Sequence, residues 1–265
     1  MTWWCAARDT AWTWTWQAYP GVWILVAGLA AAYWTLARTA EDRAPRHVRL
    51  FGAGLAVLWL AADWPLGPLG AGYLVSVHTT QYLLFSMAVP PLLLAGTPPS
   101  VLRCALLARP VAPLARALAR PLLAFAVFNV ILLATHLPAF VDTLKATQIG
   151  SFAADMAWLF AGLVFWWQVL GPLPELRPLG YPGRIVFLLL NVFVPTVPAA
   201  FLTFADYPIY ALYELAPPIG TITAVEDQQI AGLIMKTAGG FIIFGAASVL
   251  FFRWFAREGG VEGTR

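Results

Sequence analysis

Charged residues and cysteines are scarce in this chain, and each scarcity excludes a class of protein. Only 11% of the 265 residues are Asp, Glu, Lys or Arg, whereas a soluble domain carries about 25%. The two cysteines, Cys5 and Cys104, form no Cys-x-x-Cys or Cys-x-x-x-Cys motif, which excludes thiol-based copper binding and disulfide exchange. The N-terminal segment lacks the basic-then-apolar order of a signal peptide, so we expect the first apolar span to remain in the mature protein.

Apolar residues make up 60% of the chain and gather in long runs. A run of about 20 apolar residues crosses a bilayer as a helix, because a helix satisfies its own backbone hydrogen bonds in lipid. The sequence therefore predicts an all-α integral membrane protein, a single domain over residues 1–265 that forms a bundle of seven transmembrane helices. The predicted helices cover residues 20–37, 48–66, 73–95, 121–138, 150–171, 183–204 and 227–253.

Basic residues follow this pattern of spans. Of the 16 Lys and Arg residues, 13 lie in or directly beside alternate gaps, or in the C-terminal tail. The exceptions are Arg8, Lys145 and Lys236. Since basic residues stay on the cytoplasmic side of a membrane, the pattern predicts that the N-terminus is outside and the C-terminus is cytoplasmic. The net charge of +3 is thus a topology signal and no indication of nucleic-acid binding.

The few polar side chains in or beside the spans come out mostly near the predicted outer face. They are His78, Gln81, Tyr82, His136, Asp155, Asp227, Gln228 and Gln229. His78, Gln81 and Tyr82 share one face of the third predicted helix. The aromatic loop 205–226 is either a lid over this face or an ordinary interfacial loop.

Lys236 lies about ten residues into the seventh predicted span, roughly 15 Å deep by helical rise. An ammonium group at that depth faces the bundle or reaches toward an acid. Asp155, about as deep as His78, is one candidate partner, and a subunit of another protein is the second.

The residues leave three interpretations open. His78 and His136 suit a transient copper site, because imidazole is a good copper ligand. The same polar groups also fit a structural hydrogen-bond network between the third, fourth, fifth and seventh helices. Lys236 in a seventh helix resembles the Schiff-base lysine of retinal proteins, but the third helix has no carboxylate counter-ion for it.

Several segments follow one another in a characteristic order. They are HTTQY (78–82) with MAVPPLLLAGTP (87–98), THLPA (135–139), GLVFWW (162–167) with LGP (170–172), and DQQIAGLIM (227–235). Over roughly residues 20–255 the chain resembles the CtaG family of cytochrome c oxidase assembly proteins, of the seven-helix type. This family is distinct from the cysteine-dependent soluble copper chaperone that shares its name.

The resemblance implies a multi-pass protein of the bacterial inner membrane that helps to mature a haem–copper oxidase. Its expected partners are oxidase subunits and membrane lipid, without nucleic acid, and its expected cofactor is transiently bound copper. Three departures stand out: Tyr82 replaces a second histidine, Ala154-Asp155 replaces Glu-His, and Lys236 replaces an apolar residue. Tyrosine is a poor copper ligand unless it is deprotonated, and its ordinary pKa is about 10.

Two functional hypotheses remain, and neither involves turnover, so we expect no enzyme. In the first, His78 and His136, with Gln81 or Asp155, hold copper for loading into the oxidase. In the second, the copper ligands are degenerate and the chain is a permanent accessory subunit of a respiratory oxidase. The residues then expected to be structural or to dock the partner are Asp155, Lys236, Asp227, Gln228, Gln229 and Tyr82.

Overall fold

The structure is a computed structural model that describes residues 2–176 and 179–262. The described residues are 74% helical and contain no strand. The long helices are α1 (Pro20–Ala37), α2 (Pro45–Ala62), α10 (Gln148–Leu170) and α14 (Ala224–Glu262). The shorter ones are α3 (Leu66–Gly72), α4 (Val75–Leu83), α5 (Val89–Gly96), α6 (Pro99–Leu106), α7 (Ala112–Leu118), α8 (Pro121–Thr135), α9 (Pro138–Leu144), α11 (Tyr181–Leu190), α12 (Phe193–Phe204) and α13 (Ala211–Glu214). A π-helix, η1 (Leu84–Ala88), joins α4 to α5, and a 3-10 turn, η2 (Pro174–Leu176), follows α10.

Four helical segments are long and apolar enough to cross a membrane: α1, α10, α11 with α12, and α14. Three bent pairs reach the same criterion only when each pair is taken together. They are α2 with α3 (bent by 46°), the α4–α5 helix with α6 (104°), and α7 with α8 (83°). The structure thus contains four clear spans, or up to seven when each bent pair counts as one.

Proline and glycine set many of the helix boundaries. Proline occupies a first-turn position at the start of α1, α2, α6 and α8, where its missing N–H is no loss. Helix α10 ends at Gly171, whose φ of 53° is a left-handed conformation that glycine adopts freely. The sixth predicted span contains Pro195 and Pro198, and the structure interrupts it earlier, at Asn191 and Val192. The ring of Pro195 explains this position, because it conflicts with the carbonyl four residues earlier.

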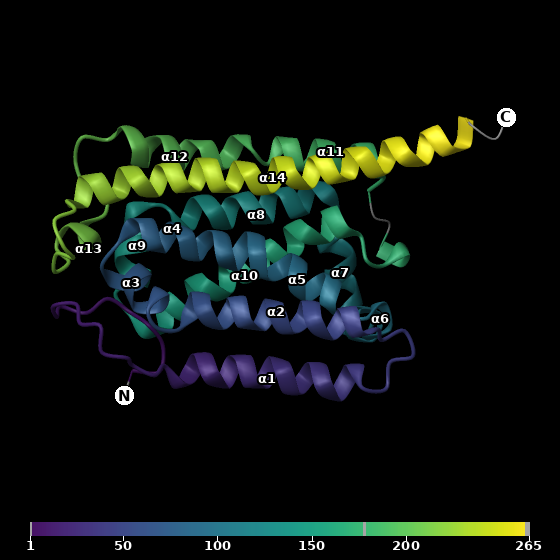
Figure 1. The fold of residues 1–265 in the computed structure, drawn as a ribbon, viewed down its shortest axis with the longest axis horizontal. Coiled ribbons are helices and arrows are strands. Elements are labelled where there is room, and N and C mark those ends of the chain that lie inside the picture. The colour runs from purple at the N-terminus through teal and green to yellow at the C-terminus, as the bar shows by residue number, and fades with distance from the viewer. Residues whose placement is uncertain (1, 177–178, 263–265) are drawn as a thin grey trace.

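Helix α10 forms the centre of the bundle. It packs against α5, η1, α8, α9 and α11, while α14 runs along α12, α11 and α4 (Figure 1). Gly162 allows α10 to approach η1 closely, since a Cβ there would collide with the carbonyl of Ser86 and the ring of Pro90. The π-helical turn lies at this crossing, and such turns often mark functional segments.

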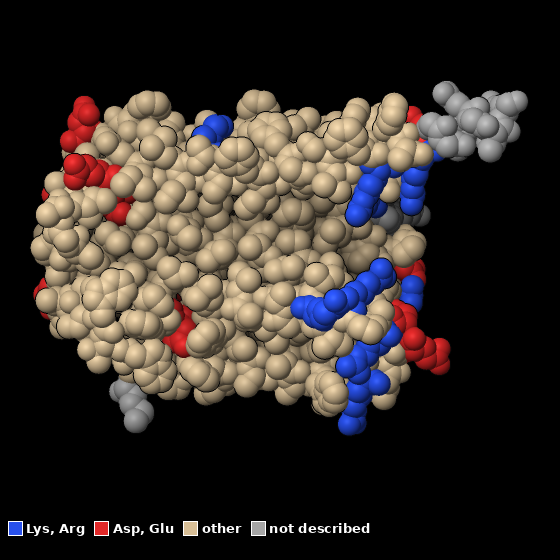
Figure 2. All heavy atoms as spheres, viewed as in Figure 1, with Lys and Arg blue, Asp and Glu red and all other residues tan. Residues whose placement is uncertain are grey.

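The two ends of the bundle differ. Lys and Arg side chains gather at the end that holds α6 and the C-terminal part of α14 (Figures 1 and 2). At the opposite end the N-terminal segment folds back onto the helices: the N–H of Gly21 donates to the carbonyl of Trp3, and the N–H of Ala7 donates to the carbonyl of Lys145, both at 2.9 Å. Helices α9 and α13 lie at this same end (Figure 1).

Candidate functional site

Two histidines meet inside the bundle at the end away from the arginines. His78 lies on α4 and His136 directly follows α8, and their ring centroids are 6.0 Å apart with an interplanar angle of 76°. Both side chains are buried, with exposed fractions of 1% and 6%. We call these two residues the histidine pair. Its convergence in space is what a two-imidazole site requires.

Hydrogen bonds determine which nitrogen of His136 carries the proton. Its Nδ1 lies 2.8 Å from the carbonyl oxygen of Leu132, and a carbonyl only accepts. Nδ1 must therefore donate, which leaves Nε2 of a neutral ring with a free lone pair. This Nε2 is buried and has no hydrogen-bond partner among the described residues.

His78 has the same arrangement. The hydroxyl of Tyr213 donates to the carbonyl of Gly70 at 2.6 Å, so its oxygen is free to accept from Nδ1 of His78 at 2.9 Å. Burial raises the pKa of Tyr213 well above its ordinary value, so the hydroxyl keeps its proton. Nε2 of His78 is again buried without a partner among the described residues. The histidine pair thus brings two unpaired imidazole lone pairs into one buried place.

Polar and aromatic groups surround the histidine pair. Gln81 donates through Nε2 to the carbonyl of Ala61 at 2.7 Å, but its Oε1 has no described partner. The ring of Tyr82 lies 4.9 Å from that of His136, and its hydroxyl is also unpaired within the described chain. The indole of Trp158, fixed by a 2.8 Å bond from Nε1 to Thr135, lies 5.1 Å from His78. Gln81 and Tyr82 therefore offer two further oxygen atoms that are weak potential metal ligands.

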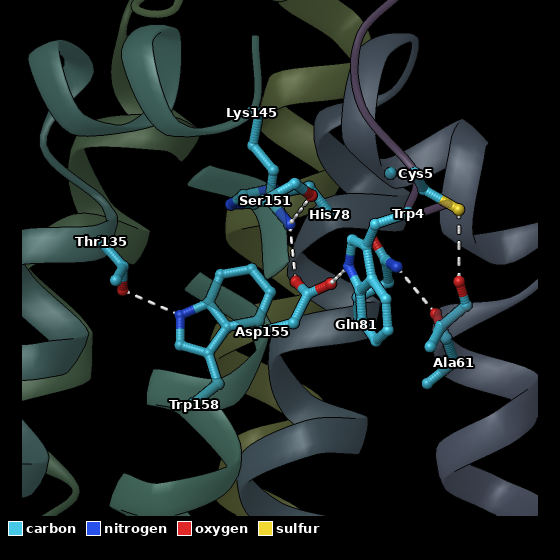
Figure 3. A network of polar contacts seen from close by, with 12 residues as sticks. Trp4, Cys5, Ala61, His78, Gln81, Thr135, Lys145, Ser151, Asp155 and Trp158 are labelled. Carbon is cyan, nitrogen blue, oxygen red and sulfur yellow. Dashed lines mark hydrogen bonds and ion pairs between the residues drawn. The ribbon is translucent and has the colours of Figure 1, made fainter. Parts of the chain in front are cut away.

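Asp155 belongs to a buried ion-paired group next to the histidine pair, shown in Figure 3. The two are adjacent through Trp158, whose ring centroid lies 4.7 Å from Nζ of Lys145 and 5.1 Å from that of His78. Its Oδ1 pairs with Nζ of Lys145 at 2.7 Å and its Oδ2 accepts from the indole of Trp4 at 2.8 Å, while Lys145 also donates to Ser151 at 3.3 Å. Both carboxylate oxygens are therefore engaged by donors, which disfavours the expected role of Asp155 as a copper ligand.

Of the two candidate partners of Lys236, Asp155 is not the one, because it pairs with Lys145. Nζ of Lys236 donates instead to the hydroxyl of Thr196 at 2.6 Å, on the surface of the bundle. The actual partner, Lys145, was assigned from hydropathy to an outer loop. It reaches Asp155 because α9 turns back against α10 and buries the lysine to 1% exposure.

The polar residues that begin α14 hold neighbouring segments in place. Asp227 accepts from the N–H of Val75 at 2.5 Å and from the hydroxyl of Ser76. Its carboxylate thereby caps the start of α4. Gln228 accepts from the N–H of Ile209 at 2.7 Å and donates to the carbonyl of Tyr207 at 3.2 Å. Gln229 adds a 3.4 Å bond to the carbonyl of Ala205. These contacts fix the loop that follows α12.

That loop lies over the histidine pair. Tyr213 contacts His78 as described above, and the hydroxyl of Tyr210 donates to the carbonyl of His136 at 2.9 Å. Of the two interpretations of segment 205–226, the contacts favour the lid.

A cavity of about 400 Å³ reaches His136 from the side of the bundle. Its wall includes Leu137 from the end of α8, Pro198 and Phe201 from α12, and Tyr210 from the loop. Leu137 and Phe201 are 51% and 68% exposed, so the cavity opens at the surface. The cavity borders His136, whose Nε2 stays buried behind it.

The donor set limits which metal fits. Among the residues that the structure describes, no group of three or more His, Cys, Asp or Glu side chains is placed to hold a metal ion. Two imidazoles without a carboxylate or thiolate ligand beside them suit copper(I), which accepts few ligands and binds imidazole well. The Nδ1–H of each ring donates to a fixed acceptor, which is the usual way in which ligand histidines are oriented.

Three important residues escaped the sequence analysis: Trp4, Lys145 and Tyr213. Lys145 carried a signal, because it is one of only two lysines and lies in a gap on the side poor in basic residues. Tyr213 lay within an aromatic loop whose contacts no periodicity reveals. Trp4 gave no separate signal among the many tryptophans of the N-terminal segment.

Comparison with known proteins agrees with the order of motifs. The family model described as cytochrome c oxidase caa3 assembly factor (Caa3_CtaG) matches residues 6–257, nearly the whole chain. No curated protein and no solved structure gives a significant match. The chain belongs to the family of cytochrome c oxidase caa3 assembly factors.

Proposed function

We propose that this chain supports oxidase assembly by holding copper(I) between Nε2 of His78 and Nε2 of His136 and passing it to the oxidase. The observation that carries the proposal is the pair of buried, unpartnered Nε2 atoms on rings only 6.0 Å apart. An unpaired buried polar atom costs free energy, so two of them on neighbouring rings indicate a ligand. Copper is the cargo of this site and not a resident cofactor.

The surroundings of the histidine pair favour brief binding. Gln81 and Tyr82 offer only a carboxamide and a phenol, neither of which is a strong copper(I) ligand. Two imidazoles then supply nearly all of the affinity, and a receiving protein with more or softer ligands is able to take the ion. The cavity beside His136 brings the surface of the bundle close to the histidine pair, while Nε2 of His136 itself stays buried.

We infer further that the bundle crosses the bacterial inner membrane seven times, with the N-terminus outside. The three bent helix pairs supply the additional spans. The arginine-rich end in Figure 2 fits the cytoplasmic side. The histidine pair, at the other end, then lies near the outer face.

Copper retention in histidine variants tests the proposal. His78→Ala and His136→Ala are expected to lose copper(I) retained through gel filtration in detergent, and each is expected to lower cytochrome c oxidase activity in membranes of cells that depend on the variant. His47→Ala is the matched control, because His47 is also buried but its Nδ1 accepts from the N–H of Ala44 at the start of α2. That variant should keep both copper and activity.

Two outcomes contradict copper loading. The first is full copper retention by both variants with the folded state intact by thermal melting. The second is wild-type protein without copper that co-purifies in fixed ratio with mature, active oxidase. The latter result would identify a resident accessory subunit with degenerate ligands.

A further inference from the structure

Lys236 is placed where a membrane protein rarely leaves a cation. Asp227 and Arg253 on α14 are separated by about 39 Å along the helix, close to the full thickness of a bilayer. Lys236 lies about 14 Å from the level of Asp227 by the same helical rise. Its side chain is exposed on the surface of the bundle and therefore faces lipid.

No carboxylate among the described residues compensates the charge of Lys236. The described residues form two ion pairs, Arg103 with Glu175 and Lys145 with Asp155. The ammonium of Lys236 donates only to the hydroxyl of Thr196 at 2.6 Å, and that hydroxyl in turn donates to the carbonyl of Val192. A neutral hydroxyl satisfies one N–H but leaves the charge unpaired, which is costly at this depth.

The surface beside Lys236 is shaped for a close neighbour. A narrow groove of about 20 Å³ lies where α14 meets α12, α4 and η1. Thr196, Lys236, Gly239 and Gly240 line it together with Tyr82, Leu83 and Met87. A Cβ added at Gly240 would meet nothing within 4 Å, so this part of α14 is open to the outside. Small residues at such positions allow helix backbones to approach closely in membranes.

We propose that this groove binds a transmembrane helix of another protein that carries a carboxylate at the depth of Lys236. The carboxylate would pair with the ammonium, and Thr196 would hold the lysine in place for it. The proposal does not depend on copper binding at the histidine pair.

A second copy of this chain does not supply the required acid. The carboxylates that lie inside the bundle are buried: Asp63, Asp155 and Asp227 have exposed fractions of 0%, 2% and 3%. The other described acidic residues lie in connections, in the short α9 and α13, or near helix ends. They are Asp9, Glu41, Asp42, Asp142, Glu175, Asp206, Glu214, Glu226 and Glu258.

The test uses a synthetic leucine-based transmembrane peptide with one central Asp, and matched peptides with Asn or Lys at that position. Association with the purified full chain is measured by energy transfer in phosphatidylcholine vesicles. The Asp peptide is expected to bind wild-type protein about tenfold more tightly than the Asn peptide, and the Lys peptide is expected to be excluded. Lys236→Met should abolish the preference for Asp, while Lys236→Arg should keep it.

Three results would overturn the proposal. Equal binding of the Asp and Asn peptides is one, and an undiminished Asp preference in a folded Lys236→Met variant is another. The third is self-association of the wild-type chain that disappears with Lys236→Met, because the surface would then serve a second copy. Thermal melting of each variant confirms that it is folded, and the surface position of Lys236 makes folding defects small.

Discussion

Replacing Asp155 by Asn would leave the ammonium of Lys145 buried without an anionic partner. The two side chains are 2% and 1% exposed and their charged atoms lie 2.7 Å apart. Removing one member of such a pair costs about 3–5 kcal/mol of unfolding free energy, because the remaining charge is uncompensated. The indole of Trp4 also loses its charged acceptor. We therefore expect both Asp155→Asn and Lys145→Met to destabilise the protein strongly.

The double variant separates the ion pair from general damage. With Asp155→Asn and Lys145→Met combined, no charge is left buried, and the loss is expected to fall short of the sum of the single losses by about 2–3 kcal/mol. The measurement is unfolding in mixed micelles of dodecyl maltoside and sodium dodecyl sulfate, followed by tryptophan fluorescence. The matched control is the exposed pair of Arg103 and Glu175, whose members are 47% and 42% exposed. Solvent screens that pair, so its coupling is expected to be close to zero. Losses that add at the buried pair would refute the buried interaction.

Further predictions concern the site and the arginine-rich end. Tyr82→His is expected to add a third imidazole beside the histidine pair, and equilibrium copper(I) titration should show tighter binding; unchanged affinity would mean that position 82 does not face the metal. Tyr213→Phe should weaken copper binding about tenfold, whereas Tyr210→Phe, which removes a bond to a backbone carbonyl only, should not; equal effects would contradict the assigned tautomers. Hydrogen bonds from the hydroxyl and N–H of Ser100 lower the pKa of Asp42. Their contribution to the stability of α6 is therefore present above the ordinary pKa of about 4 and is lost as the pH falls through the lowered value. Hydrogen exchange of α6 should rise in that range, and Ser100→Ala should remove this dependence on pH.

The apolar runs predicted the helical character of the chain because lipid imposes long stretches of apolar residues on any helix that crosses it. The bends were harder to place. The break in the sixth span falls at Asn191, four residues before Pro195. The proline ring conflicts with the carbonyl of Asn191 and not with those of the residues directly next to Pro195. The π-helical turn at Leu84–Ala88 lies at the close crossing with Gly162 and depends on tertiary packing that the local sequence does not contain.

The candidate site was predicted in part. The motifs on the third and fourth predicted helices identified His78 and His136, and the structure brings them together. Depth along a helix gave no information on which helices are neighbours. Asp155 was therefore one candidate partner of Lys236, whereas its actual partner is Lys145. Tyr213 was missed for a similar reason, since it belongs to a loop whose path is fixed by contacts with Gln228 and with Gly70.

X-ray absorption spectroscopy of the copper(I)-loaded protein tests the central claim most directly. The two-imidazole site predicts a low-coordinate copper(I) spectrum with nitrogen neighbours and the multiple-scattering pattern of histidine, and the signal should disappear in the His78→Ala/His136→Ala double variant and persist in His47→Ala. Sulfur neighbours from cysteine or methionine, or an unchanged spectrum in the double variant, would contradict the assignment of the histidine pair as the copper site.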